Sequence, residues 1–267
     1  MMFMKSNRGL LGGRLAGRRR MWVRIALVVV AVIVMAVNLY WGFVRPEQHD
    51  EVPGMRVSSD FSAAPDGPVP ATFGSGQPAT NSNGLVAPGD GMKVFDRTLT
   101  FTPTSTGRVA GYFSTPDLLS PVRDLGASWV FRPGQGDTYG AVALLISREL
   151  QNKIPQAAPP FGMHLVITPI NWNVSVKSPD LGEPLEVIAS GSFAKPLPVD
   201  GKTASTVSVR VDGGKLAIVL PDGNKTIVKD PRISRWRGNF ATFEVFVNYG
   251  ATDAYPGFTK LWAESGS

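Results

Sequence analysis

Glu244 stands alone among hydrophobic residues and is the first candidate for acid–base chemistry in this chain. In an extended strand it shares one face with Phe240, Thr242, Phe246 and Asn248. Glycoside hydrolysis needs two carboxylates, separated by about 5–5.5 Å in retaining enzymes and about 6.5–9.5 Å in inverting ones. No second acidic residue alternates with Glu244 along this segment. The pattern therefore favours a structural or sugar-binding role over catalysis.

Two short clusters combine aromatic rings with side chains that hydrogen-bond hydroxyl groups. One is the corner formed by Asn171, Trp172 and Asn173, and the other is the basic segment around Trp236. Flat aromatic rings stack on the apolar face of a sugar, while amides and guanidinium groups bind its hydroxyls. Each tryptophan could equally fill the core. The predicted ligand-binding residues are Asn171, Trp172, Asn173, Arg235, Trp236, Arg237 and Glu244.

Other catalytic chemistries lack the residues they need. The chain has two histidines, His49 and His164, and no cysteine. His164 is then the one candidate base for a serine nucleophile, and no G-x-S-x-G segment precedes a predicted helix. Aspartates in predicted turns can bind calcium, although such residues usually hydrogen-bond their own backbone. We expect no catalytic residue, no metal site and no cofactor.

An apolar run from Ile25 to Val44 is long enough to cross a bilayer as a helix, which takes about 20 residues. Seven Lys and Arg residues and no acidic residue lie in positions 1–24. Because basic flanks stay in the cytoplasm, we expect a cytoplasmic tail over 1–21 and a transmembrane helix over 22–44. The alternative is a cleavable signal peptide, whose apolar region is shorter and ends in a small-residue site.

The basic N-terminal tail accounts for the positive charge of the whole chain. The formal net charge is +6, from 27 basic and 21 acidic residues, and seven of the basic residues lie in positions 1–24. The remainder is therefore close to neutral, which argues against a nucleic-acid partner. The absence of cysteine means that no disulfide stabilises the domain.

Residues 45–91 are rich in Pro, Gly, Ser, Ala and Asn, and we expect a flexible linker there. The alternative is that Val57–Phe61 or Phe73 packs back onto the domain as an edge strand. From residue 92 onward, short β-type runs alternate with turn residues. Examples are Lys93–Phe101 and the hairpin-forming stretch Thr206–Asp230 with its Asp-Gly turns.

These ten or eleven predicted strands favour an all-β fold over residues 92–264, an antiparallel β-sandwich or jelly roll. The apolar segment 141–152 is either a buried strand or a helix, since periodicity does not separate the two.

The hairpins and the segments Gly111-Tyr112-Phe113, Trp129-Val130-Phe131 and Phe240–Val245 resemble those of exported actinobacterial proteins with a lectin-like sandwich. Concanavalin A and the laminarinase-type glucanases share that fold. The resemblance covers about 92–264 and implies a two-sheet jelly roll with a concave face for a glycan. The laminarinase-type strand carries Glu, Asp and Glu in alternation, and this chain lacks that triplet, which argues against hydrolysis.

We therefore expect a single-pass plasma-membrane protein with its N-terminus in the cytoplasm and its C-terminal domain outside. The lipid bilayer is its first partner, through residues 22–44. The domain is expected to bind a cell-envelope polysaccharide or another envelope component without catalysis, which predicts an exposed aromatic groove. A scaffold that contacts a membrane protein would instead show a flat apolar patch. A divergent glycoside hydrolase would show a second carboxylate near Glu244.

Overall fold

The computed structural model describes residues 54–84, 92–101, 109–134, 140–150, 161–176, 186–235, 237–247 and 255–266. Within these residues the chain forms sixteen strands and one short helix, α2 (Pro231–Arg235). No helix in the described part is long and apolar enough to cross a bilayer. The predicted tail 1–21 and span 22–44 lie outside the described residues.

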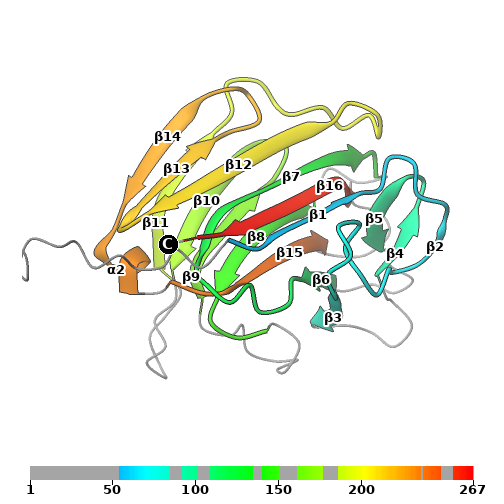
Figure 1. Cartoon of the computed structure of the whole chain (residues 1–267). Helices are drawn as coiled ribbons and strands as arrows, with labels where there is room; N and C mark the ends of the chain where they lie inside the picture. Colours follow the sequence, from blue (N-terminus) through cyan, green and yellow to red (C-terminus); the bar gives the residue numbers. More distant parts are fainter. Residues whose placement is uncertain are drawn as a thin grey trace, which may run out of the picture. The chain divides into compact units, whose positions relative to one another are not determined.

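The strands form two antiparallel sheets (Figure 1). One has nine strands, in the order β14 (Lys225–Lys229), β13 (Lys215–Val219), β12 (Ser205–Asp212), β7 (Val122–Arg132), β16 (Tyr255–Ser265), β5 (Thr98–Phe101), β4 (Met92–Phe95) and β2 (Gly67–Pro68), with β1 (Arg56–Asp60) also paired to β16. The other has seven, in the order β11 (Glu186–Ser192), β10 (Asn171–Val176), β9 (Phe161–Ile167), β8 (Ala141–Ser147), β15 (Phe240–Val247), β6 (Val109–Ser114) and β3 (Thr80–Gly84). The predicted all-β antiparallel architecture is confirmed.

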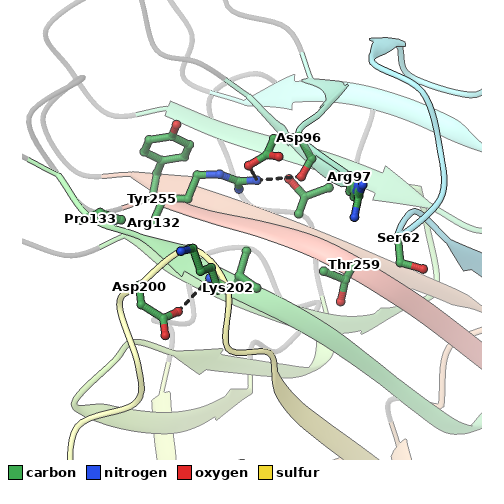
Figure 2. A pocket seen from close by; sticks show the side chains of 12 residues that line it. Ser62, Asp96, Arg97, Arg132, Pro133, Asp200, Lys202, Tyr255 and Thr259 are labelled. Atoms are coloured by element: carbon green, nitrogen blue, oxygen red, sulfur yellow. Dashed lines mark hydrogen bonds and ion pairs between the residues drawn. The ribbon is translucent and has the colours of Figure 1, made fainter.

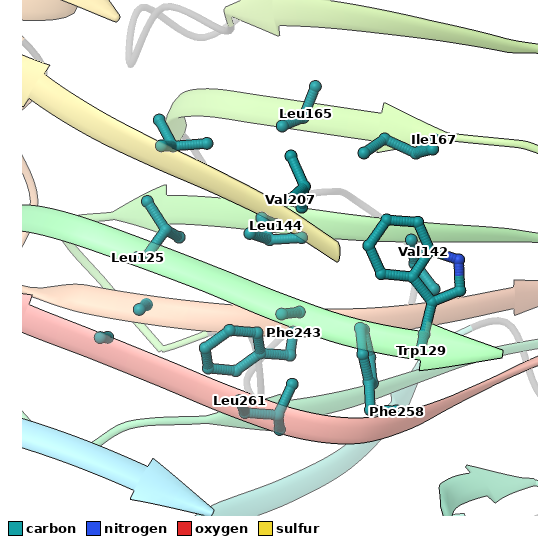
Figure 3. Close-up of a cluster of buried hydrophobic side chains, with 14 of the residues drawn as sticks. Leu125, Trp129, Val142, Leu144, Leu165, Ile167, Val207, Phe243, Phe258 and Leu261 are labelled. Carbon is teal, nitrogen blue, oxygen red and sulfur yellow. The ribbon is translucent and has the colours of Figure 1, made fainter. Parts of the chain in front are cut away.

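The core lies between the inward faces of the two sheets (Figure 3). Trp129 of β7 and Phe258 of β16 come from one sheet, and Phe243 of β15 comes from the other. All three are fully buried, and the rings of Phe243 and Phe258 meet edge to face with centroids 6.1 Å apart. Edge-to-face contact is a favoured arrangement of aromatic pairs.

Segment 141–147 is a buried strand and not a helix, the two structures between which its sequence could not decide. β8 pairs with β15 on one side and with β9 on the other, and all seven of its residues are buried. A strand covered on both faces needs apolar residues at consecutive positions, so it shows no alternation. This burial explains why periodicity did not distinguish it from a helix.

The expectation of a linker over 45–91 is wrong for residues 54–84, which belong to the sandwich. β1 pairs with β16 along Arg56–Asp60, which is the edge-strand alternative. Val57, Phe61 and Phe73 are 3% exposed or less and lie in the core. The Pro and Gly residues of this stretch separate very short strands. Its composition is therefore similar to that of a flexible linker, although the segment is folded.

Segment 93–101 forms a hairpin and not the single strand that its pattern suggested. β4 and β5 pair so that Phe95 lies opposite Thr98, which leaves Asp96 and Arg97 as a two-residue loop. Both loop residues have positive φ angles, of 46° and 60°. Tight hairpins favour this loop geometry, but a long side chain at positive φ is strained.

Replacing Arg97 with glycine is expected to stabilise the protein by about 1 kcal/mol, because glycine adopts positive φ without steric cost. The melting temperature should rise by about 2–4 °C in calorimetry. Gly213 is the matched control, with φ of 56° and open space around its Cα. Gly213→Ala should lower the melting temperature by a similar amount, and a rise there would contradict this account.

Candidate functional site

Trp172 of the predicted Asn-Trp-Asn cluster lies in the hydrophobic core. Its exposed fraction is 8%, and it packs against Gly191 of the neighbouring strand β11. A methyl group at position 191 would lie 2.8 Å from the indole nitrogen of Trp172, so glycine makes room for the ring. A side chain held in this way fills the core and offers no ring face for stacking on a sugar.

The two asparagines of the cluster point away from the core and take part in local hydrogen bonds. The Oδ1 atom of Asn171 accepts a hydrogen bond from the hydroxyl of Thr168 at 2.8 Å, within the turn between β9 and β10. The Oδ1 atom of Asn173 accepts one from Ser175 at 3.3 Å. The side-chain oxygens of both asparagines are therefore used in local hydrogen bonds that stabilise the turn and the strand.

The predicted arginines lie far from the asparagines. Arg235 ends α2 and is exposed, and Trp236 lies outside the described residues. The neighbouring Arg232 forms an ion pair with Glu186, at the end of β11 opposite to Ser192, which pairs with Asn171. Seven residues of strand separate the two ends, a length of about 20 Å. The structure therefore does not bring the two predicted clusters together.

Glu244 is buried on the outward face of the seven-stranded sheet, next to His164. The Nε2 atom of His164 lies 3.2 Å from the Oε2 atom of Glu244. Tyr112 pairs directly with Glu244 across β6 and β15. Burial raises the pKa of the Tyr112 hydroxyl, and the charge of Glu244 raises that pKa further, so the phenol stays protonated at neutral pH.

This cluster lacks the second carboxylate that a hydrolase requires. The nearest strands of the sheet, β6, β8, β9 and β10, contain no Asp or Glu within their described bounds. Glu186 on β11 is four strands from β15, a distance of about 19 Å that far exceeds the hydrolase range. Among the described strands, then, Glu244 has no partner for glycoside hydrolysis.

A polar cavity of about 720 Å³ opens on the outward face of the nine-stranded sheet (Figure 2). Its floor is formed by β5, β7 and β16, and its sides by the Asp96–Arg97 hairpin loop and the loop that contains Asp200. The lining residues are Ser62, Asp96, Arg97, Thr98, Val130, Arg132, Pro133, Asp200, Gly201, Lys202, Tyr255 and Thr259. Its volume falls within the range of small-molecule sites, about 300–1,000 Å³. We call it the Arg132 cavity.

Arg132 is the most deeply placed charge of the cavity. It ends β7 on the face opposite to Phe131, and its exposed fraction is 7%. The guanidinium group lies 5.7 Å from the ring centre of Tyr255, within cation–π range. Its Nη2 atom donates to the carbonyl of Asp96 at 3.1 Å and lies 3.3 Å from the carboxylate of the same residue.

The remaining terminal nitrogen of Arg132, Nη1, is buried and finds no hydrogen-bond acceptor among the described residues. A guanidinium group has five N–H donors, and leaving one buried without a partner costs about 1–3 kcal/mol or more. The side chain fits because residue 257 is glycine: a methyl group there would lie 2.7 Å from Nη1. The site thus contains a buried cation with unused donor capacity.

Asp200 fixes the loop that carries Lys202 to the cavity. Its carboxylate accepts hydrogen bonds from the Thr203 hydroxyl at 2.6 Å and from the amides of Thr203 and Lys202 at 2.7 and 2.8 Å. These bonds, led by the two from Thr203, lower the pKa of Asp200 from 3.8 to about 2. The carboxylate is therefore engaged in holding its own turn.

Asp200→Asn is expected to destabilise the protein at neutral pH, with an effect that shrinks in acid. A carboxyl whose pKa is depressed by folding contributes stability above its ordinary pKa of 3.8, and that contribution disappears as the pH falls toward about 2. Urea unfolding of both proteins at several pH values would measure this. A difference that stays constant between these two pH values would contradict the assigned hydrogen bonds.

None of the residues that line the Arg132 cavity was predicted from the sequence as a binding residue. Two signals were present: an arginine directly after Trp129-Val130-Phe131, and a charged pair, Asp96-Arg97, inside a segment read as one strand. The loop that brings Lys202 close has no sequence pattern that connects it to either.

A smaller cavity of about 340 Å³ contains the predicted residue Arg237, together with Arg123 and Arg210. Two of these three arginines are paired with carboxylates: Arg123 lies 3.0 Å from Asp124 and 2.7 Å from Glu264, and Arg210 lies 3.1 Å from Asp124. These carboxylates are less exposed than that of Asp96 in the Arg132 cavity.

The architecture defines the class of fold as a lectin-like two-sheet β-sandwich, and solved structures share it. A point mutant of the Emp46p carbohydrate recognition domain matches with a TM-score of 0.52 at 12% identity, over 69% of this chain and 87% of that one. The Ca²⁺- and Man2-bound exoplasmic/lumenal domain of VIP36 matches with a TM-score of 0.52 at 13% identity, over 78% and 87%.

A bacteriophage protein has the same fold. The CBM2 module of the evolved Dit of Lactobacillus casei BL23 phage J-1 matches with a TM-score of 0.53 at 11% identity, over 80% of this chain and 96% of that one. No family model and no curated protein sequence matches this chain. At these identities the likeness establishes the fold, as the resemblance to lectin-like sandwiches implied. Actinobacterial origin and export remain predictions.

Proposed function

We propose that the domain is a non-catalytic carbohydrate-binding module and that the Arg132 cavity is its binding site. The fold, shared with carbohydrate recognition domains and with a phage carbohydrate-binding module, is the observation that carries this proposal. The cavity adds a volume suited to a short oligosaccharide and a lining of hydroxyl and charged groups. It offers one aromatic ring, Tyr255, among its lining residues, and so matches the expected aromatic groove only in part.

The proposal extends to the place where the domain works. We propose that residues 22–44 anchor the chain in the plasma membrane and that the domain binds a cell-envelope polysaccharide on the outside. Support comes from the length of the apolar run and from the basic residues that precede it.

Glycan-array binding of the full chain, purified in mild detergent, tests the function. We expect binding to at least one envelope polysaccharide, and loss of that binding in Thr259→Phe, which places a ring inside the cavity. Thr206→Phe is the matched control, because Thr206 is exposed on β12 of the same sheet, away from the cavity. Binding to no glycan would overturn the proposal, and equal loss in both variants would overturn the choice of cavity.

Reporter fusions at the C-terminus test the proposed anchor. Alkaline phosphatase fused after Ser267 should be active in intact cells, whereas green fluorescent protein at the same position should stay dark. The chain should sediment with membranes and resist extraction by carbonate. A fluorescent fusion, or a chain recovered without detergent, would contradict this placement.

The scaffold alternative receives no specific support from the described surface. Val219 and Ile227, on the paired strands β13 and β14, are the two exposed large hydrophobic residues that strand pairing places side by side. The others come from separate segments: Phe95, Leu119, Ile170 and Val187. The hydrolase alternative lacks a second carboxylate among the described strands near Glu244.

A further inference from the structure

We infer that the ligand of the Arg132 cavity carries an anionic group, a carboxylate or a phosphate attached to a sugar, and that Arg132 is the donor that receives it. This inference rests on the proposed function and adds the charge class of the ligand. It is carried by three features of the cavity: the unused donor of Arg132, the surplus of positive charge, and the geometry of a guanidinium group.

The first feature is the unused donor at the floor of the cavity. Two parts of the Arg132 guanidinium are occupied, its face by Tyr255 and its Nη2 atom by Asp96. Nη1 is buried and has no acceptor among the described residues. A ligand that places an oxygen atom against Nη1 satisfies a donor that the protein leaves unmatched, and a charged oxygen makes the stronger bond.

The second feature is the charge balance of the lining. Arg97, Arg132 and Lys202 face two carboxylates, those of Asp96 and Asp200. Both carboxylate oxygens of Asp200 accept hydrogen bonds from the amides and the hydroxyl of its own turn. The carboxyl of Asp96 is 65% exposed and contacts Arg132 at 3.3 Å, where water screens much of the attraction. Positive charge therefore dominates in the cavity.

Three paired arginines elsewhere on the domain contrast with Arg132 in the carboxylates that they contact. In the smaller cavity, Arg123 and Arg210 each have a carboxylate within 3.1 Å. Arg232 is likewise bound by Asp230 and by Glu186. Arg132 differs from these in being more deeply buried and in having its single carboxylate contact on an exposed side chain.

The third feature is the geometry of the donor. Because Nη2 already contacts Asp96, the guanidinium group offers a ligand its Nη1 donor, and a charged oxygen of a carboxylate or phosphate accepts from it more strongly than a hydroxyl does. The exposed cations Arg97 and Lys202 lie on opposite sides of the cavity, on separate loops (Figure 2). A sugar bound between them would direct its acidic group to Arg132 and its hydroxyls to the rim.

Isothermal titration of the full chain with two matched pairs of probes tests the inference. One pair is trigalacturonic acid and its neutral methyl ester, and the other is mannose 6-phosphate and mannose. We expect the acidic member of one pair to bind at least about tenfold more tightly than its neutral partner, and its affinity to fall as salt is added. The pair that shows this difference identifies carboxylate or phosphate as the natural group.

Variants of the cavity rim avoid the risk of unfolding. Arg97→Asn removes a charge while keeping a residue that tolerates positive φ, and Lys202→Gln removes the charge of an exposed side chain. The double variant should bind the acidic probe about tenfold more weakly, whereas Lys225→Gln, on the distant strand β14, should leave binding unchanged. Arg132→Lys keeps the charge but removes the Nη1 donor, and it should lose the preference for acid while its melting curve shows a folded domain.

The outcomes separate this inference from the proposed function. Equal affinity for acidic and neutral probes, no binding of either acidic probe, or unchanged binding by the double variant would overturn the anionic ligand. If a neutral glycan bound the array in any of those cases, the proposed function would stand. An array without any bound glycan would overturn the proposed function itself.

Discussion

Phe243→Ala is expected to lower the free energy of unfolding by about 3–5 kcal/mol, because it removes a large buried ring and leaves a cavity between the sheets. Phe243 has no exposed surface and meets Phe258 of the opposite sheet at 6.1 Å (Figure 3). Loss of this ring therefore weakens the contact between the sheets as well as the packing of β15. Urea unfolding of the full chain, followed by tryptophan fluorescence, would measure the change.

Phe246 provides the control on the same strand. It points to the opposite face of β15 and is only partly buried. Phe246→Ala should cost no more than about 1–2 kcal/mol, since part of its ring already contacts water. If the two substitutions had equal effects, the assigned alternation of β15 would be wrong.

His164→Leu is expected to destabilise the protein by roughly 3–5 kcal/mol, because it leaves the buried carboxylate of Glu244 without its partner. The exposed fractions of the two side chains are 18% for His164 and 10% for Glu244, so water compensates little. The neighbouring residues of β8, Ala143 and Leu145, are apolar and buried and offer no hydrogen-bonding side chain.

A double-mutant cycle separates this pairing from simple loss of packing. The variant with leucine at both positions should be more stable than His164→Leu alone, because no uncompensated charge remains buried. A coupling free energy of about 1 kcal/mol or more is expected for residues in direct contact. Additive effects of the two single substitutions would mean that the 3.2 Å contact contributes nothing to stability.

The placement of Glu244 shows what alternation along a strand can and cannot predict. Alternation along the strand predicted that Glu244 points to one face of β15 and that Phe243 and Val245 point to the other. The structure confirms that Phe243 and Val245 face the core. Its partner His164 is 80 residues away and comes close because β9 and β15 both pair with β8. No local pattern contains the order of strands in a sheet, so no local pattern predicted this contact.

Trp172 and Arg132 also show that local sequence does not predict contacts between strands: one was predicted to bind a sugar and is buried, and the other was not predicted and lines the cavity. Trp172 was a candidate for sugar stacking because it stands between two asparagines, but Gly191 on the adjacent strand opens the space that buries it. Arg132 was not a candidate, but in the folded chain it lies at the centre of the cavity, in contact with Asp96 and Tyr255 and next to Gly257. In both cases a residue on another strand decided the role.

The sequence by itself determined the class of the domain, since alternating apolar residues, Asp-Gly turns and the lack of long amphipathic helices leave an antiparallel sandwich as the way to bury these side chains. It also set the charge distribution, with positive charge concentrated before the apolar run. Only the tertiary structure decided that residues 54–84 complete the sandwich and where a binding cavity lies. Edge pairing and cavity walls arise from contacts between distant segments, and their energies depend on strand order rather than on local propensity.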